Sequence, residues 1–479
     1  MNRWVGFLSL LLLNVAGAEE VRIGEVRPPV DLSTSRLALE YRDAAQRIID
    51  AALSSHEAYK KLEQLCDDIG HRLSGSPQLD AAIAWALESM KRDGLENVRA
   101  EPVMVPKWVR GKESATMIRP REMPMPMLGL GGSVATPPEG ISAEVVSVRD
   151  EAELDALGER ARGKIILFDN PMPAYTPEGG THYGTTVRFR GRGASLAAEK
   201  GAVACLVRSV TARSLQTPHT GAMRYKDDVP RIPAAAITIE DASMISRLQA
   251  RGIPVEVRLS MEAKSHEPVP SANVVAEFRG TEKPDEIVLI SGHLDSWDAG
   301  TGAHDDGGGC VQAMEAASLL RRLNLRPRRT IRVVLWTNEE NGLAGGKQYL
   351  KDHESELSKH VAAIESDGGS FAPRGYTVEC KDEQRQNSAI AQMREILELV
   401  SSIGPMKVDA GGSGADIGPM KPFGVLLMGH NVEPSIYFDY HHTHADTLDK
   451  VNPKELAQNV AVMATVAFVL ADMPGRFGE

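Results

Sequence analysis

The sequence predicts an α/β fold in which a mostly parallel, mixed sheet is flanked by helices and interrupted by an inserted β-rich domain. Three observations support this fold class. From about residue 272 onward, continuous apolar runs alternate with amphipathic helical stretches, which is typical of a sheet covered on both faces. Between residues 125 and 265 the pattern changes to short β-rich runs and proline-rich loops. Before that, residues 36–65 and 79–93 have the apolar spacing of helices.

The N-terminus has the pattern of a cleaved signal peptide over residues 1–18. Arg3 precedes an apolar run at 4–13, and Ala16-Gly17-Ala18 supplies the small residues of a cleavage site. The run is too short to span a bilayer, and a buried first helix is the alternative interpretation. No later stretch has the about 18 unbroken apolar residues of a membrane helix. We therefore expect a protein that is secreted or periplasmic and has no membrane span.

Composition excludes some partners. The chain has 479 residues and a formal net charge of −11, and it contains no long Lys/Arg run that could follow a phosphate backbone. Nucleic acid is therefore not an expected partner. The four cysteines lie far apart without a C-x-x-C motif; export would permit one or two disulfides, but the sequence does not determine a pairing, and we expect Cys205 and Cys310 to be buried thiols.

The remaining elements divide the mature chain into three parts. Residues 19–124 begin the main domain, residues 125–265 form the inserted domain, and residues 266–479 complete the main domain. Within the insert, the apolar runs 164–168, 202–207 and 234–239 predict strands. In the last part, four apolar runs predict strands at 287–290, 331–336, 361–364 and 425–428. Each is followed by a predicted helix, at 309–323, 346–357, 389–403 and 453–471.

Metal-binding residue types follow three of these strands. His293 and Asp295 come after the first run, Glu339 and Glu340 after the second, and Asp367 after the third. Ligands of open α/β sheets bind beyond the carboxyl ends of the strands. We therefore expect these side chains to meet at one edge of the sheet.

Two further segments complete the set. Asp305 lies in a glycine-rich stretch that joins the first strand to its helix, where glycine lets the backbone approach a site closely. His441, His442 and Asp446 lie between the fourth strand and the last helix. A mixed histidine and carboxylate set suits Zn²⁺, and a carboxylate shared by two ions would hold them close together.

These segments resemble the M28 family of zinc peptidases in both order and separation. The segments that carry the resemblance are Gly292-His293-Leu294-Asp295, Gly302-Ala303-His304-Asp305-Asp306, Asn338-Glu339-Glu340, Glu365-Ser366-Asp367 and His442-Thr443-His444-Ala445-Asp446-Thr447. Arg72-Leu73-Ser74-Gly75-Ser76 and Thr217-Pro218-His219-Thr220-Gly221 extend it over most of the mature chain. The resemblance implies that the insert is a protease-associated domain and that the main domain is catalytic.

The resemblance also implies a division of roles. It assigns His293 and Asp367 to one zinc ion, Glu340 and His442 to a second, and Asp305 to the bridge between them. Glu339 would be the general base that takes a proton from the attacking water.

The surroundings of these ligands carry further predictions. We expect the Asp295 carboxylate to fix the tautomer of His293, and Asp446 to do the same for His442. His441 stands where many family members have a tyrosine that steadies the oxyanion, and we predict the same role for it.

Neighbouring residues leave alternatives open. His444 is an alternative ligand to His442, whereas His304 is expected to be a bystander and Asp306 to shape its loop. Cys310 begins a helix, where a thiol could be activated, but no paired base is evident and we predict a packing role.

The resemblance implies hydrolysis of short peptides, dipeptides foremost, by an exported exopeptidase of the carboxypeptidase type with two zinc ions. An aminopeptidase of the same family is one alternative, because both specificities exist on this scaffold. An inactive binding protein is another, although all five ligands and the base are present. Acyl transfer by a one-zinc, glutaminyl cyclase-like enzyme is a third. Besides the peptide substrate, the partner that we consider is a second copy of the chain in a homodimer.

Overall fold

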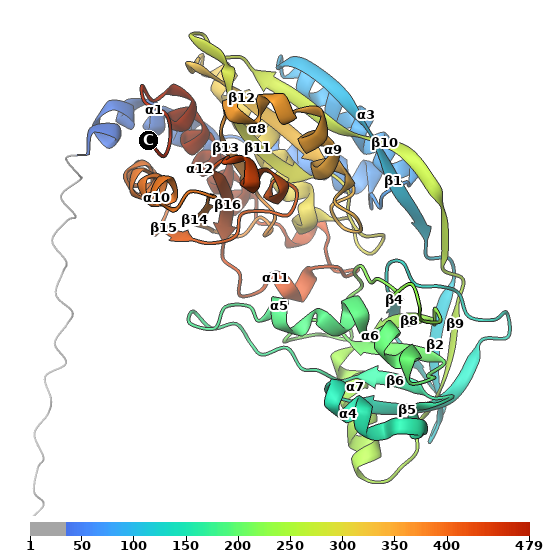
Figure 1. Cartoon of the computed structure of the whole chain (residues 1–479). Coiled ribbons are helices and arrows are strands. Elements are labelled where there is room, and N and C mark those ends of the chain that lie inside the picture. Colours follow the sequence, from blue (N-terminus) through green and yellow to red (C-terminus); the bar gives the residue numbers. More distant parts are fainter. Residues whose placement is uncertain (1–34) are drawn as a thin grey trace, which may run out of the picture.

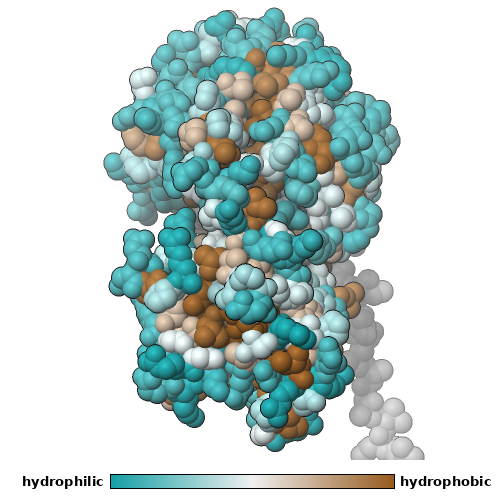
Figure 2. Space-filling model, turned by 90° about the vertical axis from the view of Figure 1, so that its right-hand side faces the viewer, coloured by the Kyte–Doolittle hydropathy of each residue, from teal (hydrophilic) through white to brown (hydrophobic). Residues whose placement is uncertain are grey.

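The computed structural model describes residues 35–479, in two domains (Figure 1). The predicted signal peptide lies outside the described residues. The main domain forms the upper part of Figure 1, and the second domain, residues 113–261, forms the lower part. Figure 2 shows them as two lobes that meet at a narrower waist. All four cysteines lie within the described residues and are free and buried, which confirms the expectation for Cys205 and Cys310.

The main domain contains a mixed sheet of eight strands in the order β1-β10-β12-β11-β13-β16-β14-β15. Their bounds are β1 Glu96–Val109, β10 Lys264–Phe278, β11 Lys283–His293, β12 Arg329–Trp336, β13 His360–Glu365, β14 Pro373–Glu379, β15 Lys407–Ala410 and β16 Leu427–Val432. The central strands β12, β11, β13 and β16 are parallel to one another. The pairs β1–β10, β10–β12 and β14–β16 are antiparallel, and the edge pair β14–β15 is parallel. The prediction of a mixed sheet with a parallel centre is confirmed.

Helices cover both faces of this sheet. The helices of the main domain are α1 Arg36–Leu53, α2 Glu57–Glu63, α3 Pro77–Arg92, α8 Gly308–Arg322, α9 Ala344–Asp352, α10 Glu383–Glu398, α11 Tyr437–Tyr440 and α12 Pro453–Asp472. Short helical turns are η1 Gln64–Ile69, η3 Ala303–Gly307, η4 Glu354–Lys359, η5 Gly418–Phe423 and η6 Leu448–Lys450. The four helices predicted after the apolar runs correspond to α8, α9, α10 and α12 and are confirmed.

Alternate residues of the central strands pack against different helices, because successive side chains of a strand point to opposite faces. Val288 and Ile290 join the larger core under α1, α8 and α12, whereas Ile287 and Leu289 join the core that includes α9 and η5. Helix α12 is long and apolar enough to cross a membrane, but 78% of its apolar window is buried inside the domain. It is therefore explained as a core helix of the main domain.

The second domain contains its own eight-stranded sheet, in the order β3-β2-β9-β5-β6-β7-β8-β4. Its strands are β2 Glu113–Arg119, β3 Met123–Met125, β4 Met127–Gly129, β5 Ile141–Val148, β6 Ile165–Phe168, β7 Ala204–Arg208, β8 Ala234–Ile237 and β9 Glu256–Met261. Its helices are α4 Glu151–Leu157, α5 Tyr183–Thr186, α6 Arg188–Glu199 and α7 Ile239–Ala250, with a helical turn η2 at Gly158–Ala161. The sheet includes β2, so it begins earlier than residue 125. Its identity as a protease-associated domain stays a prediction.

Two short links join the domains side by side. Residues 110–112 connect β1 to β2, and residues 262–263 connect β9 to β10. The links are hydrogen-bonded to each other, since Glu262 N–H donates to the Lys112 carbonyl at 3.0 Å. In Figure 1 they lie at the edge of the molecule where β1 and β10 run down toward the second domain, while α11 lies between the two domains.

Candidate metal centre

The five predicted metal ligands meet at the carboxyl edge of the main sheet. His293 is the last residue of β11, Glu340 follows β12 and Asp367 follows β13. Asp305 lies in the turn η3 before α8, and His442 follows α11. The topology thus brings together residues that are up to 149 positions apart in the sequence, from His293 to His442.

Asp305 lies between the two histidines. Its Oδ1 is 3.2 Å from Nε2 of His293, and its Oδ2 is 3.2 Å from Nε2 of His442. On one side, Asp367 Oδ1 lies 3.4 Å from Nε2 of His293; on the other, Glu340 Oε2 lies 3.0 Å from Nε2 of His442. One group therefore contains His293 and Asp367, and the other contains His442 and Glu340. Asp305 lies between the groups and contacts both histidines.

The donor set fits metal ions of the zinc type. Asp305 Oδ2 and Glu340 Oε1 are buried and accept no hydrogen bond from the described residues. Buried polar atoms without hydrogen bonds are costly, so these oxygens need a cation or another polar partner. Imidazole nitrogens and carboxylate oxygens are the donors that zinc takes in catalytic sites.

Electrostatics also favours added positive charge. Burial and the charge of Asp305 raise the pKa of Glu340 to about 7, against partial compensation by His442. Burial opposes the ionisation of Asp305, but the neighbouring imidazoles of His293 and His442 outweigh it and hold its pKa well below the usual value. Burial lowers the pKa of His442, but the carboxylates of Glu340 and Asp305 outweigh this and raise it to about 9. Divalent cations would relieve the repulsion among these crowded carboxylates.

Glu339 lies in the same cavity as these ligands but forms no ion pair with a described residue. The turn after β12 separates it from Glu340: Asn338 has φ 66°, and Leu343 N–H donates to the Asn338 carbonyl at 2.6 Å. Burial raises the pKa of Glu339 well above its usual value, and the charges of Asp367 and Glu340 raise it further, against a lowering effect of His293. A carboxyl group in this environment holds a proton more readily than an exposed glutamate does.

The carboxylate of Asp295 bonds the main chain after β12, and not the imidazole of His293 as predicted. The Asp295 carboxylate accepts hydrogen bonds from the N–H groups of Glu339 at 2.9 Å and Glu340 at 3.3 Å. Nδ1 of His293 lies 3.0 Å from the main-chain carbonyl of Asp295, and 3.8 Å from its carboxylate. The prediction thus named the correct residue but the wrong atom as the nearest partner of the imidazole, because the chain turns back over His293 at this point.

Asp446 has a different partner from the one predicted. Its carboxylate accepts the N–H groups of His304 at 2.7 Å and Asp305 at 3.1 Å, so it fixes the turn that carries Asp305. Nδ1 of His442 instead lies 3.2 Å from the carbonyl of Thr220 and 3.3 Å from Nη1 of Arg190, both in the second domain. The spacing of Asp446 to His442 in the sequence could not reveal this contact between domains.

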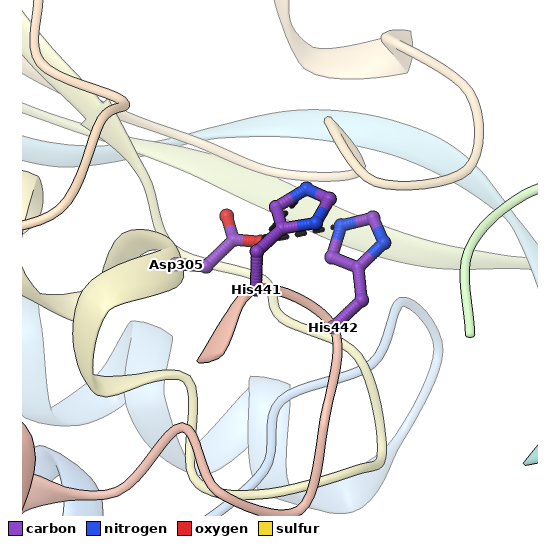
Figure 3. Close-up of side chains that lie close together, drawn as sticks. All are labelled: Asp305, His441 and His442. Atoms are coloured by element: carbon purple, nitrogen blue, oxygen red, sulfur yellow. Dashed lines mark ion pairs between the residues drawn. The ribbon is translucent and has the colours of Figure 1, made fainter. Parts of the chain in front are cut away.

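Of the three neighbouring histidines, two face Asp305 (Figure 3). The His441 ring stacks on the His442 ring with centroids 3.5 Å apart, and Nε2 of His441 lies 3.7 Å from Asp305 Oδ2. Burial and the charge of His442 hold the pKa of His441 well below its usual value, so the ring is neutral. His444 is exposed and makes no ion pair with the other ligands among the described residues.

The other neighbours predicted not to bind metal have structural contacts. His304 stacks on Phe371 at 4.3 Å, and its Nδ1 accepts the Ser370 N–H. Asp306 accepts the N–H groups of His293 at 3.0 Å and of Gly309 at 2.9 Å, and so ties the turn to β11. The Cys310 thiol is buried and lies 3.1 Å from the His293 carbonyl.

A cavity of about 410 Å³ opens over the ligands between the domains. The main domain contributes four of the five ligands, all but His293, together with Glu339, residues 341–343, Tyr437, Phe438 and His441. The second domain contributes Tyr183, Arg190, Ala222 and Arg224. None of these four was predicted as a site residue, because no local pattern marks a wall that faces a site on another domain.

Comparisons with known proteins agree on one family. The sequence model of Peptidase family M28 matches residues 273–467. The chain is 44% identical over 436 residues to carboxypeptidase Q of Mus musculus, which covers 90% of both chains. It is similar to the solved structure of a peptidase M28 precursor from Shewanella amazonensis, with a TM-score of 0.87, 39% identity, and coverage of 91% of this chain and 98% of that one. A zinc aminopeptidase from Bacillus subtilis shares the fold, with a TM-score of 0.62 and 21% identity over 88% of this chain and 96% of that one.

Proposed function

The chain belongs to peptidase family M28 and is a zinc metallopeptidase, and from this premise we propose that it is an exported carboxypeptidase with two zinc ions that cleaves short peptides, dipeptides foremost. The observation that carries the proposal of two ions is the position of Asp305, whose two oxygens each lie 3.2 Å from a different histidine.

His293, Asp367 and Asp305 would hold one zinc ion, and His442, Glu340 and Asp305 would hold the other. When bound, zinc supplies Lewis-acid chemistry, which polarises a peptide carbonyl and makes water acidic enough to attack near neutral pH. The chain itself supplies the positions of these ligands and the cavity between the domains in which the substrate would bind.

Glu339 is the proposed proton carrier. Its carboxylate would take a proton from the attacking water and then deliver it to the nitrogen of the leaving amine. Its raised pKa supports this role, since a group with a pKa nearer neutrality can both accept and release a proton. Glu340, its neighbour in sequence, lies against His442 and is therefore proposed as a metal ligand and not as the base.

His441 is the proposed donor to the oxyanion that develops on the peptide carbonyl. It lines the cavity, and its Nδ1 is buried without a hydrogen-bond partner among the described residues. A neutral imidazole can donate one hydrogen bond, and donors aimed at the developing charge lower the barrier to hydrolysis. Tyr437 is a second candidate, because it lies on the same cavity wall one helical turn earlier and carries a hydroxyl group.

The charge of the second domain favours recognition of a carboxyl terminus. Arg190 and Arg224 line the cavity, and neither forms an ion pair with a carboxylate of the described residues. Arg190 is only 8% exposed, so its charge is without a counter-ion in a site that excludes much of the solvent. The free carboxylate of a short peptide would supply that counter-ion. The relatives named carboxypeptidase Q agree with this direction of cleavage.

The alternatives differ in observable ways. An aminopeptidase would require a free amino group on its substrate, and an inactive binding protein would hydrolyse neither kind of peptide. A cyclase-like acyl transferase would use one zinc ion, and a single ion would not require Asp305 to contact two histidines. We also propose that the protein is exported, because residues 1–18 have the pattern of a signal peptide. A homodimer is the proposed assembly, and analytical ultracentrifugation would measure it.

One experiment separates these functions. The mature protein would be incubated with one dipeptide in four forms: free, N-acetylated, C-amidated and blocked at both ends, with and without a zinc chelator. A carboxypeptidase cleaves the free and N-acetylated forms and spares the C-amidated form, and the chelator abolishes cleavage. Cleavage of the C-amidated form and not of the N-acetylated form would instead establish an aminopeptidase. Cleavage that persists in chelator would refute the zinc mechanism.

A further inference from the structure

The second domain holds one of the proposed metal ligands through its main chain. Thr220 N–H donates to the His442 carbonyl at 3.0 Å, and the Thr220 carbonyl lies 3.2 Å from Nδ1 of His442. Two hydrogen bonds to one residue fix both its backbone and its ring. His442 also has φ 63°, in the left-handed region that non-glycine residues seldom adopt, so its backbone needs such support.

These contacts set the direction of the imidazole. Because Nδ1 lies against the Thr220 carbonyl, Nε2 is the ring nitrogen that faces Asp305 and Glu340 and that would bind the metal. A histidine that binds a metal usually donates its other ring N–H to an oxygen that fixes its tautomer and orientation. For His293 that oxygen belongs to the main domain, at Asp295, whereas for His442 it belongs to the second domain.

The hydroxyl group of Thr220 anchors this main chain to the link between the domains. Thr220 Oγ1 donates to the Gly129 carbonyl at 2.7 Å and accepts from Nη2 of Arg110 at 3.3 Å. Arg110 belongs to the link from β1 to β2, and it pairs with Asp298 of the main domain at 2.5 and 2.9 Å. A continuous set of polar contacts therefore runs from the main domain through the link to Thr220 and on to His442.

Arg190 of the second domain also lies next to the contact between Thr220 and His442. Its Nη1 lies 3.5 Å from the Thr220 carbonyl, and its Nη2 donates to the Tyr183 hydroxyl at 2.6 Å. Gly221 makes room for it, because a Cβ at this position would lie 2.4 Å from the Arg190 guanidinium carbon. The segment 220–221 is thus packed directly against Arg190 of α6, within the second domain.

We propose that Thr220 is a positioning residue of the metal centre, and that binding of the zinc ion at His442 is coupled to docking of the second domain on the main domain. The Thr220–His442 contact joins the two domains directly, so a movement of the second domain away from the main domain would separate Thr220 from His442. By reciprocity, whatever favours docking strengthens zinc binding at His442, and zinc at His442 favours docking. This inference rests on the proposed two-zinc centre.

The test compares Thr220→Val with Thr220→Ser. Valine has the shape of threonine but cannot bond Gly129 or Arg110, whereas serine keeps the hydroxyl group. Metal-free protein would be titrated with zinc against a chromophoric chelator, which reports the number of ions and the affinity of each without any substrate. We expect wild type and Thr220→Ser to bind two ions alike, and Thr220→Val to bind one as wild type and the other about 10- to 100-fold more weakly.

The outcomes are distinguishable. Two ions bound by Thr220→Val with wild-type affinities would overturn the role of Thr220 and leave the proposed function standing. Wild type that binds fewer than two ions would overturn the two-zinc centre itself, and the coupling with it. Hydrogen exchange of the wild-type protein adds a measurement that needs no variant: zinc should slow exchange of the Thr220 amide, which donates to His442, more than that of amides in β7. Equal protection of both would contradict the coupling.

Discussion

The carboxylate of Asp305 contacts the two histidines through different oxygens, with Oδ1 3.2 Å from His293 and Oδ2 3.2 Å from His442. A single carboxylate in this position can serve both halves of a metal centre. The neighbouring carboxylates serve one half each, since Asp367 lies against His293 and Glu340 against His442.

The first prediction follows from this asymmetry. Asp305→Asn keeps the size of the side chain and removes its charge, and we expect it to weaken both zinc ions and to lower kcat/KM by roughly 10³-fold or more. Asp367→Asn and Glu340→Gln should each weaken a single ion. Elemental analysis of protein dialysed at a buffered zinc concentration measures the occupancy. Loss of only one ion in Asp305→Asn would show that this residue does not bridge.

The second prediction separates the base from the ligand beside it. Glu339→Gln should keep both zinc ions and lower kcat by roughly 10²- to 10⁴-fold, because the glutamine amide cannot accept the proton of the attacking water. Glu340→Gln is the matched control, with the same chemical change one residue along the chain, and it should lose metal. Parallel assays of kcat and of zinc content check both. Full activity of Glu339→Gln would refute the assignment of the base.

The third prediction concerns the oxyanion. His441→Ala should lower kcat by roughly 10²- to 10³-fold with little change in zinc content, because it removes a hydrogen-bond donor from the cavity. Tyr437→Phe is the comparison, since it removes only the hydroxyl group from the same wall. If the rate fell in Tyr437→Phe and stayed unaltered in His441→Ala, the role would belong to the tyrosine.

Much of this site could be predicted because apolar runs locate the strands of a parallel sheet, and their ends locate its ligand-binding edge. His293, Glu340 and Asp367 each follow such a run. Strand β1 was not predicted, because half of its residues are exposed and it contains no long continuous apolar run. Strand β14 is mostly buried, but it contains Pro373 and Gly375 and no continuous apolar run, so it was not predicted either.

Contacts made by the main chain were harder to predict than contacts made by side chains. The carbonyls of Asp295 and Thr220 lie next to the ring nitrogens of His293 and His442, and a carbonyl leaves no mark in a sequence. Thr220 is also 222 residues from His442, so only the folded arrangement of two domains brings them together. By contrast, the carboxylates of Asp295 and Asp446 are recognisable in the sequence, but they bond main-chain N–H groups of neighbouring turns.

The fourth prediction is a pH dependence of stability at the end of α9. Nε2 of His353 lies 3.1 Å from Glu101 in β1. Burial opposes the charge of His353, but its hydrogen bond with Glu101 outweighs this and raises the pKa of His353 above 6.5. Burial likewise opposes the charge of Glu101, but the bond with His353 lowers the pKa of Glu101 below 4.5.

The signs of these shifts define a window. The contribution of His353 to the free energy of unfolding is complete below its pKa in the unfolded chain and is lost as pH rises through its raised pKa in the folded chain. The contribution of Glu101 is complete above its pKa in the unfolded chain and is lost as pH falls through its lowered pKa in the folded chain. His353→Gln should therefore lower the free energy of unfolding by about 1 kcal/mol near pH 5.5 and by less near pH 9. Urea unfolding at both pH values measures this. His266→Gln, an exposed histidine of β10, is the control, and an equal loss at both pH values in His353→Gln would contradict the pairing.

The fifth prediction tests recognition of the substrate carboxylate. Arg224 is exposed on the rim of the cavity and its guanidinium has no ion-pair partner among the described residues. Arg224→Ala should raise KM for a free dipeptide by about 5- to 50-fold, the effect of losing one partly solvated, charge-assisted hydrogen bond, while kcat and zinc content change little. Arg192→Ala is the matched control, because Arg192 lies in the same domain but pairs with Glu151. For a dipeptide whose carboxyl group is amidated, Arg224→Ala and wild type should have the same low kcat/KM. An equal rise in KM for both dipeptides would mean that Arg224 contacts the substrate elsewhere than at its carboxylate.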